Sequence, residues 1–240
     1  MAHPLRQRGP LMRRFALVLA LFLPAAAQAG ESVRSTTQVV AGEDGRDAFL
    51  ASVRAHLASS RSPIGRNTFE ALENGTILLD TLDNLTVSDC RQLVEENPRQ
   101  WSGVVAADEC VERANGRARV PAKILSTVSG YQHENRIYVR RTPKIAEAAA
   151  TVVHETNHVA NRTHERYGSA HEILEEEYRA YYVTLLYTDG RAPGAGYLGW
   201  LKRWIVEQYA LDIAPASIPD VPRGVLDNAV AVEKPIAAIP

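Results

Sequence analysis

The spacing of hydrophobic residues in the first half of the chain predicts two amphipathic helices. Apolar side chains recur three and four positions apart in residues 44–59, which is the period of an α-helix. A second helical segment follows at residues 62–75. Ser62 precedes a proline and can cap this helix, and Gly75 supplies its stop.

The next part of the chain has shorter apolar runs. A run between turn-forming residues predicts a strand within residues 76–87, and residues 122–141 predict two strands joined by a polar turn. Residues 88–118 have the pattern of helix pieces and loops. Because strands and helices both occur and the strands are few, we expect an α+β fold with a small sheet packed on helices.

Two longer helices are predicted in the second half of the chain. Thr142 and Pro143 form a typical helix start, and no breaker follows until about Arg162. Apolar residues of this segment fall on one arc at 100° per residue, whereas His154 and His158 share a different arc. The helix is therefore expected to bury one side and to present both imidazoles on another.

The second of these helices, in residues 170–187, contains three adjacent glutamates. Its phase places Glu177 in the centre of an apolar arc, Glu176 at the edge, and Glu175 on the outer face, where it can pair with Arg179 four residues later. A carboxylate on an apolar face is costly unless it is paired or bound to a metal. Of the three glutamates, Glu177 is therefore the one whose position is least consistent with a solvent-exposed acidic helix face.

The two ends of the chain differ from its middle. Residues 1–29 have a basic stretch, an apolar run and small residues ending at Ala29, which is the pattern of a cleaved secretory signal; the run is short for a membrane anchor. Residues 30–42 are expected to be a loose leader, residues 43–211 the folded domain, and residues 212–240 a proline-rich tail. The product is expected to be secreted or periplasmic, without membrane insertion.

Charge excludes one class of partner. The chain has 27 basic and 28 acidic residues, and four of the arginines lie in the signal segment, so the mature chain carries 27 − 4 = 23 basic residues and a net charge of −5. No basic stripe remains that could follow a phosphate backbone, so nucleic acid is not expected as a partner.

Only two cysteines occur, Cys90 and Cys110. An exported chain meets an oxidising compartment, so we expect a disulfide between them, with two buried thiols as the alternative. Two cysteines are too few for a four-thiolate zinc cluster within one chain.

The segment HETNH, residues 154–158, carries the candidate chemistry. Histidines four apart on a helix stand one turn apart on the same face, so His154 and His158 can each give one nitrogen to a single Zn²⁺. Glu155 is offset from both, and it can reach a water beside the metal and take its proton.

Two residues compete to be the third ligand. His164 lies ten residues after His154, as in the metzincin pattern, but that pattern also needs a methionine turn, and both methionines of this chain lie in the signal segment. Glu177 instead requires the chain to return in a second helix after a loop, and Ser169 can cap that helix. The buried phase of Glu177 favours this second arrangement.

The His154-Glu155-x-x-His158 motif, followed by Glu177 with Ala180 three residues later, resembles the gluzincin branch of zincin metallopeptidases. The segment SPIGRNTFEAL is also similar to one upstream of the zinc helix in short secreted bacterial effector peptidases. The resemblance implies a zincin-like fold, one Zn²⁺ per chain, Glu155 as general base and a polypeptide substrate. The candidate donors to the reaction's oxyanion are Tyr181, Tyr182 and His171.

A non-catalytic protein of the cell envelope is the alternative. Zinc could brace such a binding protein, with His164 as a fourth ligand that closes the site. Glu155 would then have no role, which favours the peptidase.

Overall fold

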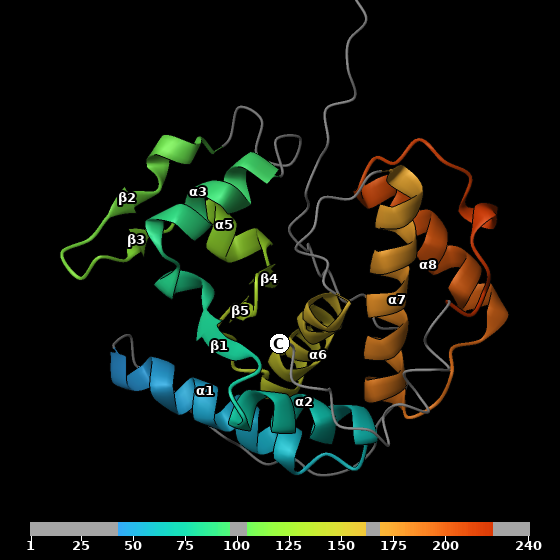
Figure 1. Ribbon diagram of the computed structural model, residues 1–240, viewed down its shortest axis with the longest axis horizontal. Helices are drawn as coiled ribbons and strands as arrows, with labels where there is room; N and C mark the ends of the chain where they lie inside the picture. Colours follow the sequence, from blue (N-terminus) through green and yellow to red (C-terminus); the bar gives the residue numbers. More distant parts are fainter. Residues whose placement is uncertain (1–42, 97–104, 162–168, 223–240) are drawn as a thin grey trace, which may run out of the picture.

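The computed structural model describes residues 43–96, 105–161 and 169–222 (Figure 1). The predicted signal segment, the leader, the end of the tail and His164 lie outside these ranges. The first helices are α1 (Glu43–Ala58), α2 (Pro63–Glu73), α3 (Val87–Glu96) and α5 (Ala122–Thr127). The later helices are α6 (Ile145–Ala160), α7 (Ala170–Asp189) and α8 (Ala195–Gln208), with short 3-10 turns at Leu82–Asn84, Ala107–Glu109 and Pro215–Ser217.

The strands form two small sheets. A three-stranded sheet has the order β1-β5-β4, from β1 (Leu78–Thr81), β5 (Arg136–Val139) and β4 (Gly130–His133). β1 is parallel to β5, with Leu79 opposite Ile137, whereas β4 is antiparallel to β5. β2 (Val111–Glu112) and β3 (Ala118–Arg119) make a separate antiparallel pair. The mixture of helices with few strands confirms the α+β class.

The three-stranded sheet separates two cores because its side chains alternate between its faces. Ile137 and Val139 of β5 pack with residues of α1 and α6, whereas Tyr138, between them, packs with the hydrophobic residues of α3 and α5. A third core joins α7 to α8. Figure 1 shows α6 between these groups, with α3, α5 and the β2–β3 pair on one side and α7 and α8 on the other.

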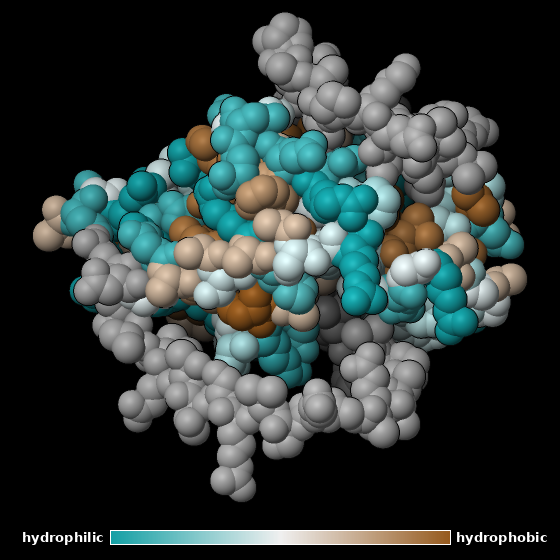
Figure 2. Space-filling view, turned by 90° about the horizontal axis from the view of Figure 1, so that it is seen from below, coloured by the Kyte–Doolittle hydropathy of each residue, from teal (hydrophilic) through white to brown (hydrophobic). Residues whose placement is uncertain are grey.

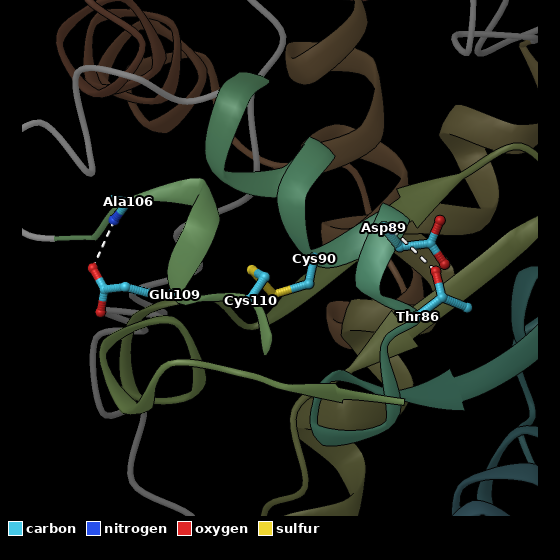
Figure 3. Close-up of a disulfide and its surroundings, with 6 residues drawn as sticks. All are labelled: Thr86, Asp89, Cys90, Ala106, Glu109 and Cys110. Carbon is cyan, nitrogen blue, oxygen red and sulfur yellow. Dashed lines mark hydrogen bonds between the residues drawn. A yellow bond between two sulfur atoms is a disulfide. The ribbon is translucent and has the colours of Figure 1, made fainter. Parts of the chain in front are cut away.

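The disulfide holds the core on the α3 side. Cys90 of α3 is bonded to Cys110, and both residues are fully buried, which confirms the predicted pairing (Figure 3). Close by, the Asp89 amide donates to the Thr86 hydroxyl at the start of α3, and the Ala106 amide donates to the Glu109 carboxylate. The bridge therefore ties α3 to the short turn that precedes β2.

Several helix boundaries follow the predicted signals. Gly75 takes a left-handed φ of +76° directly after α2, as expected of a stop residue. Ser169 caps α7 and forms a reciprocal capping box with Glu172, and Gly190 ends the same helix at a φ of +67°. α6 begins two residues later than predicted, at Ile145, because the Thr142 hydroxyl accepts the Lys144 amide before the first helical turn.

Two elements differ from the predictions. Residues 122–127 form the one-and-a-half-turn helix α5 rather than a strand, and α8 was not predicted. The part of the tail that is described packs against α7 and α8: Ile218 is buried, and Lys202 of α8 donates to the Ile218 carbonyl and to Asp220. On the face seen in Figure 2, hydrophobic residues are interspersed with hydrophilic ones in small patches.

Candidate metal centre

The two histidines of α6 meet at one point inside the molecule. His154 is completely buried and His158 is 6% exposed, because α6 is enclosed by α1, α2, the sheet and α7. Their Nε2 atoms lie 3.1 Å apart. Two ligands of one tetrahedral zinc, each about 2.0–2.1 Å from the ion, would lie about 3.3 Å apart. The spacing of the imidazoles therefore fits a shared ion.

Glu177 of α7 completes this group. Its carboxylate oxygens lie 3.5 Å from His154 Nε2 and 3.7 Å from His158 Nε2, and the ligand atoms of the three residues all lie within 4.8 Å of one another. All three side chains are buried. His154, His158 and Glu177 thus form a group that can hold a metal ion, and we refer to them as the triad.

The electrostatics of the triad couple its members. Burial lowers the pKa of His154, which favours the neutral imidazole that metals bind. Burial also opposes protonation of His158, but the neighbouring Glu177 and Glu176 outweigh it and raise the pKa to about 9. Burial raises the pKa of Glu177, yet the two histidines more than offset this and keep it below its ordinary value. A bound cation would take the place of the His158 proton.

Glu155 lies beside the triad without belonging to it. The side chain is buried, and burial raises its pKa to about 8. Within the described residues, its Oε1 atom has no hydrogen-bond partner, and neither does His154 Nδ1. A buried carboxylate oxygen without a hydrogen-bond partner destabilises the folded state unless another group binds to it.

The edge strand β4 approaches Glu155 closely, and Gly130 makes the approach possible. A Cβ atom at Gly130 would lie 2.6 Å from Glu155 Oε1 and 2.5 Å from the Thr151 methyl group. Any side chain at this position would therefore displace Glu155. The absence of a side chain lets the backbone of β4 lie against the glutamate.

Glu176 is a site residue that the sequence pattern did not indicate. Predicted at the edge of α7, it is only 6% exposed, and its Oε1 lies 3.4 Å from His158 Nδ1. Arg179 donates to the same carboxylate at 2.7 Å, whereas its distance to Glu175 is 3.9 Å. Asn161, at the end of α6, also donates to Glu176. Glu176 thereby fixes the ring of His158 from the side opposite the triad.

The candidate oxyanion donors occupy different places. The Tyr181 ring meets the His154 ring edge-on, with centroids 4.6 Å apart. Tyr182 lies in the core between α7 and α8, and His171 stands on the exposed first turn of α7, near Glu175. Only Tyr181 of these three contacts a triad residue.

Tyr209, at the end of α8, is a second missed residue. It is 5% exposed, and burial together with the adjacent Glu177 raises the pKa of its hydroxyl well above 10. Its neighbours include Tyr181, so two tyrosine hydroxyls lie beside the carboxylate of the third candidate ligand. The apolar spacing in residues 198–209 is the sequence signal that could have located this helix end.

Comparisons with protein-family models, with curated proteins and with solved structures found no match to the chain. Among the helices that the structure describes, none combines the length and the apolar composition needed to cross a lipid bilayer.

Proposed function

We propose that this protein is an exported zinc metallopeptidase in which Glu155 is the general base. The donor set supports zinc: two imidazole nitrogens and one carboxylate are typical of catalytic zinc sites, which keep a further position open for substrate or water. The disulfide is consistent with an oxidising compartment, in keeping with a secreted or periplasmic protein.

The observation that carries the proposal is the position of Glu155. It is buried beside three candidate ligands, and among the described side chains its Oε1 has no hydrogen-bond partner. Zinc in the triad would supply Lewis-acid chemistry and would lower the pKa of this carboxylate from its raised value of about 8. Glu155 would then accept a proton from the attacking water and return it to the leaving amine.

The surroundings supply the other parts of a hydrolytic site. Within the described residues, β4 pairs with β5 on one side only, so its outer edge can pair with an extended peptide. Gly130 brings this strand against Glu155, which places a peptide on that edge near the base. The hydroxyls of Tyr181 and Tyr209 are the candidates to donate a hydrogen bond to the oxyanion of the tetrahedral intermediate.

The test is the Glu155→Gln variant, which keeps the size of the side chain but removes its basicity. The zinc-loaded variant should hydrolyse casein, or a peptide library prepared from a proteome, at least about a hundredfold more slowly than the wild type. Its zinc content should be unchanged. Equal hydrolysis by both proteins, or no hydrolysis by the zinc-loaded wild type across the library, would contradict the proposal.

A further inference from the structure

A row of aromatic rings leads from the triad to the surface. Tyr181 contacts His154 on one side and the Trp204 ring on the other, with 5.3 Å between the centroids of Tyr181 and Trp204. Trp204 stacks on Trp200 at 6.2 Å, and Trp200 contacts Tyr197 at 5.2 Å. Tyr197, Trp200 and Trp204 lie at positions i, i+3 and i+7 of α8, and we refer to these three residues as the aromatic ladder.

Exposure increases along the row of rings from the triad to Trp200, and Tyr197 beyond it is partly buried. His154 is completely buried and Tyr181 is 6% exposed, whereas Trp200 is 40% exposed. The buried stripe of α8 lies one position further along the chain and consists of Leu198, Leu201 and Ile205, and Tyr197 and Trp204 pack partly against the same core. The helix is therefore anchored without Trp200, and the exposed indole is not explained by the packing of α8.

The position of the ladder points to the substrate as its occupant. The row of rings is continuous with a candidate metal ligand, so the exposed Trp200 lies within the reach of a peptide that extends from the triad. An extended peptide covers about 3.4 Å per residue, so the ring contacts between His154 and Trp200 correspond to at most about five residues. Stacked and edge-on rings favour other aromatic groups and large apolar side chains.

We propose that Tyr197, Trp200 and Trp204 bind an aromatic or large aliphatic side chain of the polypeptide substrate, within about five residues of the bond that is cleaved. This inference rests on the proposed peptidase function for the identity of its ligand. It predicts that side chains such as Phe and Leu are preferred over small polar ones at one substrate position.

Binding can be measured without turnover, because two of the three tryptophans of the chain belong to the ladder. A Trp101→Phe, Glu155→Gln protein, loaded with zinc, would be titrated while its tryptophan fluorescence is recorded. The probes are two nine-residue peptides of Gly, Ser and Thr that differ only in having Phe or Ser at the centre. The Phe peptide should give a saturable change, with an affinity about tenfold higher than that of the Ser peptide.

The matched variants assign this preference to the ladder. Trp200→Ala should reduce the affinity for the Phe peptide about tenfold, with Trp204 still reporting, and Trp200→Phe should restore most of it. Val111→Ala, which truncates an exposed apolar residue on β2, should have no effect. Equal affinities for the two peptides, or an unchanged affinity in Trp200→Ala, would overturn the inference.

The two proposals fail in different ways. A protein that binds the Phe peptide through Trp200 but hydrolyses nothing in the library would refute the peptidase and retain the binding surface. A protein that hydrolyses the library with no preference for large apolar residues near the cleaved bond would refute only the role of the ladder.

Discussion

Two clusters of acidic, histidine and tyrosine side chains lie on opposite faces of the three-stranded sheet. One is centred on Asp89 of α3, which contacts His133 Nδ1 at 2.8 Å and accepts a hydrogen bond from the Tyr138 hydroxyl. The other contains the triad, Glu155 and the tyrosines near Glu177. Their compositions are similar, but their hydrogen bonding is not.

In the Asp89 cluster the Asp89 carboxylate is the hydrogen-bond partner of both His133 and Tyr138. Burial raises the pKa of Asp89, but the hydrogen bonds with His133 and Tyr138 outweigh it and hold the pKa at about 2. In the triad cluster one nitrogen of each imidazole and the Glu177 carboxylate lie within 4.8 Å of one another, and among the described residues Glu155 Oε1 has no hydrogen-bond partner. A satisfied network rigidifies a fold, whereas a convergent and unsatisfied one requires an additional group. The comparison thus separates a structural cluster from a candidate functional one.

The largest expected effect is the dependence of stability on metal. Zinc at a thousand times its dissociation constant should stabilise the wild type by about 4 kcal/mol, because it binds the folded chain. His158→Ala should lose this gain, and Asp89→Asn should keep it. Thermal unfolding with zinc and with a chelator measures this gain in both variants. If zinc stabilised His158→Ala as much as the wild type, the triad would not be the metal site, and the two clusters would no longer differ in this respect.

A smaller effect, on zinc affinity, is expected at Glu176, which contacts His158 from outside the triad. Glu176→Gln should weaken zinc binding about 10- to 100-fold, because the charge that fixes the His158 ring is lost. Glu175→Gln is the matched control one position away: its side chain is 3.9 Å from Arg179 and contacts no triad residue, so less than about a twofold change is expected. Competition with a chromogenic chelator measures both affinities. A larger loss in Glu175→Gln would show that the assignment of the two roles is wrong.

The Asp89 cluster should respond to acid instead of metal. The pKa of Asp89 is lower in the folded protein than the ordinary aspartate value of 3.8, so the ionised carboxylate adds stability above that value. This contribution, on the order of 2 kcal/mol, should be lost as the pH falls from about 4 to about 2. Urea unfolding at pH 6 and at pH 3 should show the gap between the wild type and Asp89→Asn narrowing in acid. A gap that is independent of pH would contradict this role.

The sequence predicted the residues whose position depends on a single helix. The spacing of His154 and His158, the phase of Glu177 and the cap at Ser169 are local features of α6 and α7, and the arrangement of these side chains agrees with them. The disulfide was predictable because only two cysteines occur. The peptidase activity and the likeness to gluzincins stay predictions.

What the sequence did not predict depends on contacts between helices. Glu176 lies at the edge of the apolar arc of α7, but α6 covers that edge and brings His158 and Asn161 to it. Tyr209 is 32 positions after Glu177, and only the return of α8 along α7 brings the two together. A helical phase gives the direction of a side chain, but it does not identify the neighbour that the side chain meets.

The triad is tested most directly by the metal content of the purified protein, measured by elemental analysis in the wild type, Glu177→Ala and Asp89→Asn. We expect about one zinc per chain in the wild type and in Asp89→Asn, and a loss of most of it in Glu177→Ala with a native circular-dichroism spectrum. A wild type that takes up no zinc, or a Glu177→Ala protein that retains it fully, would show that the triad is not a zinc site.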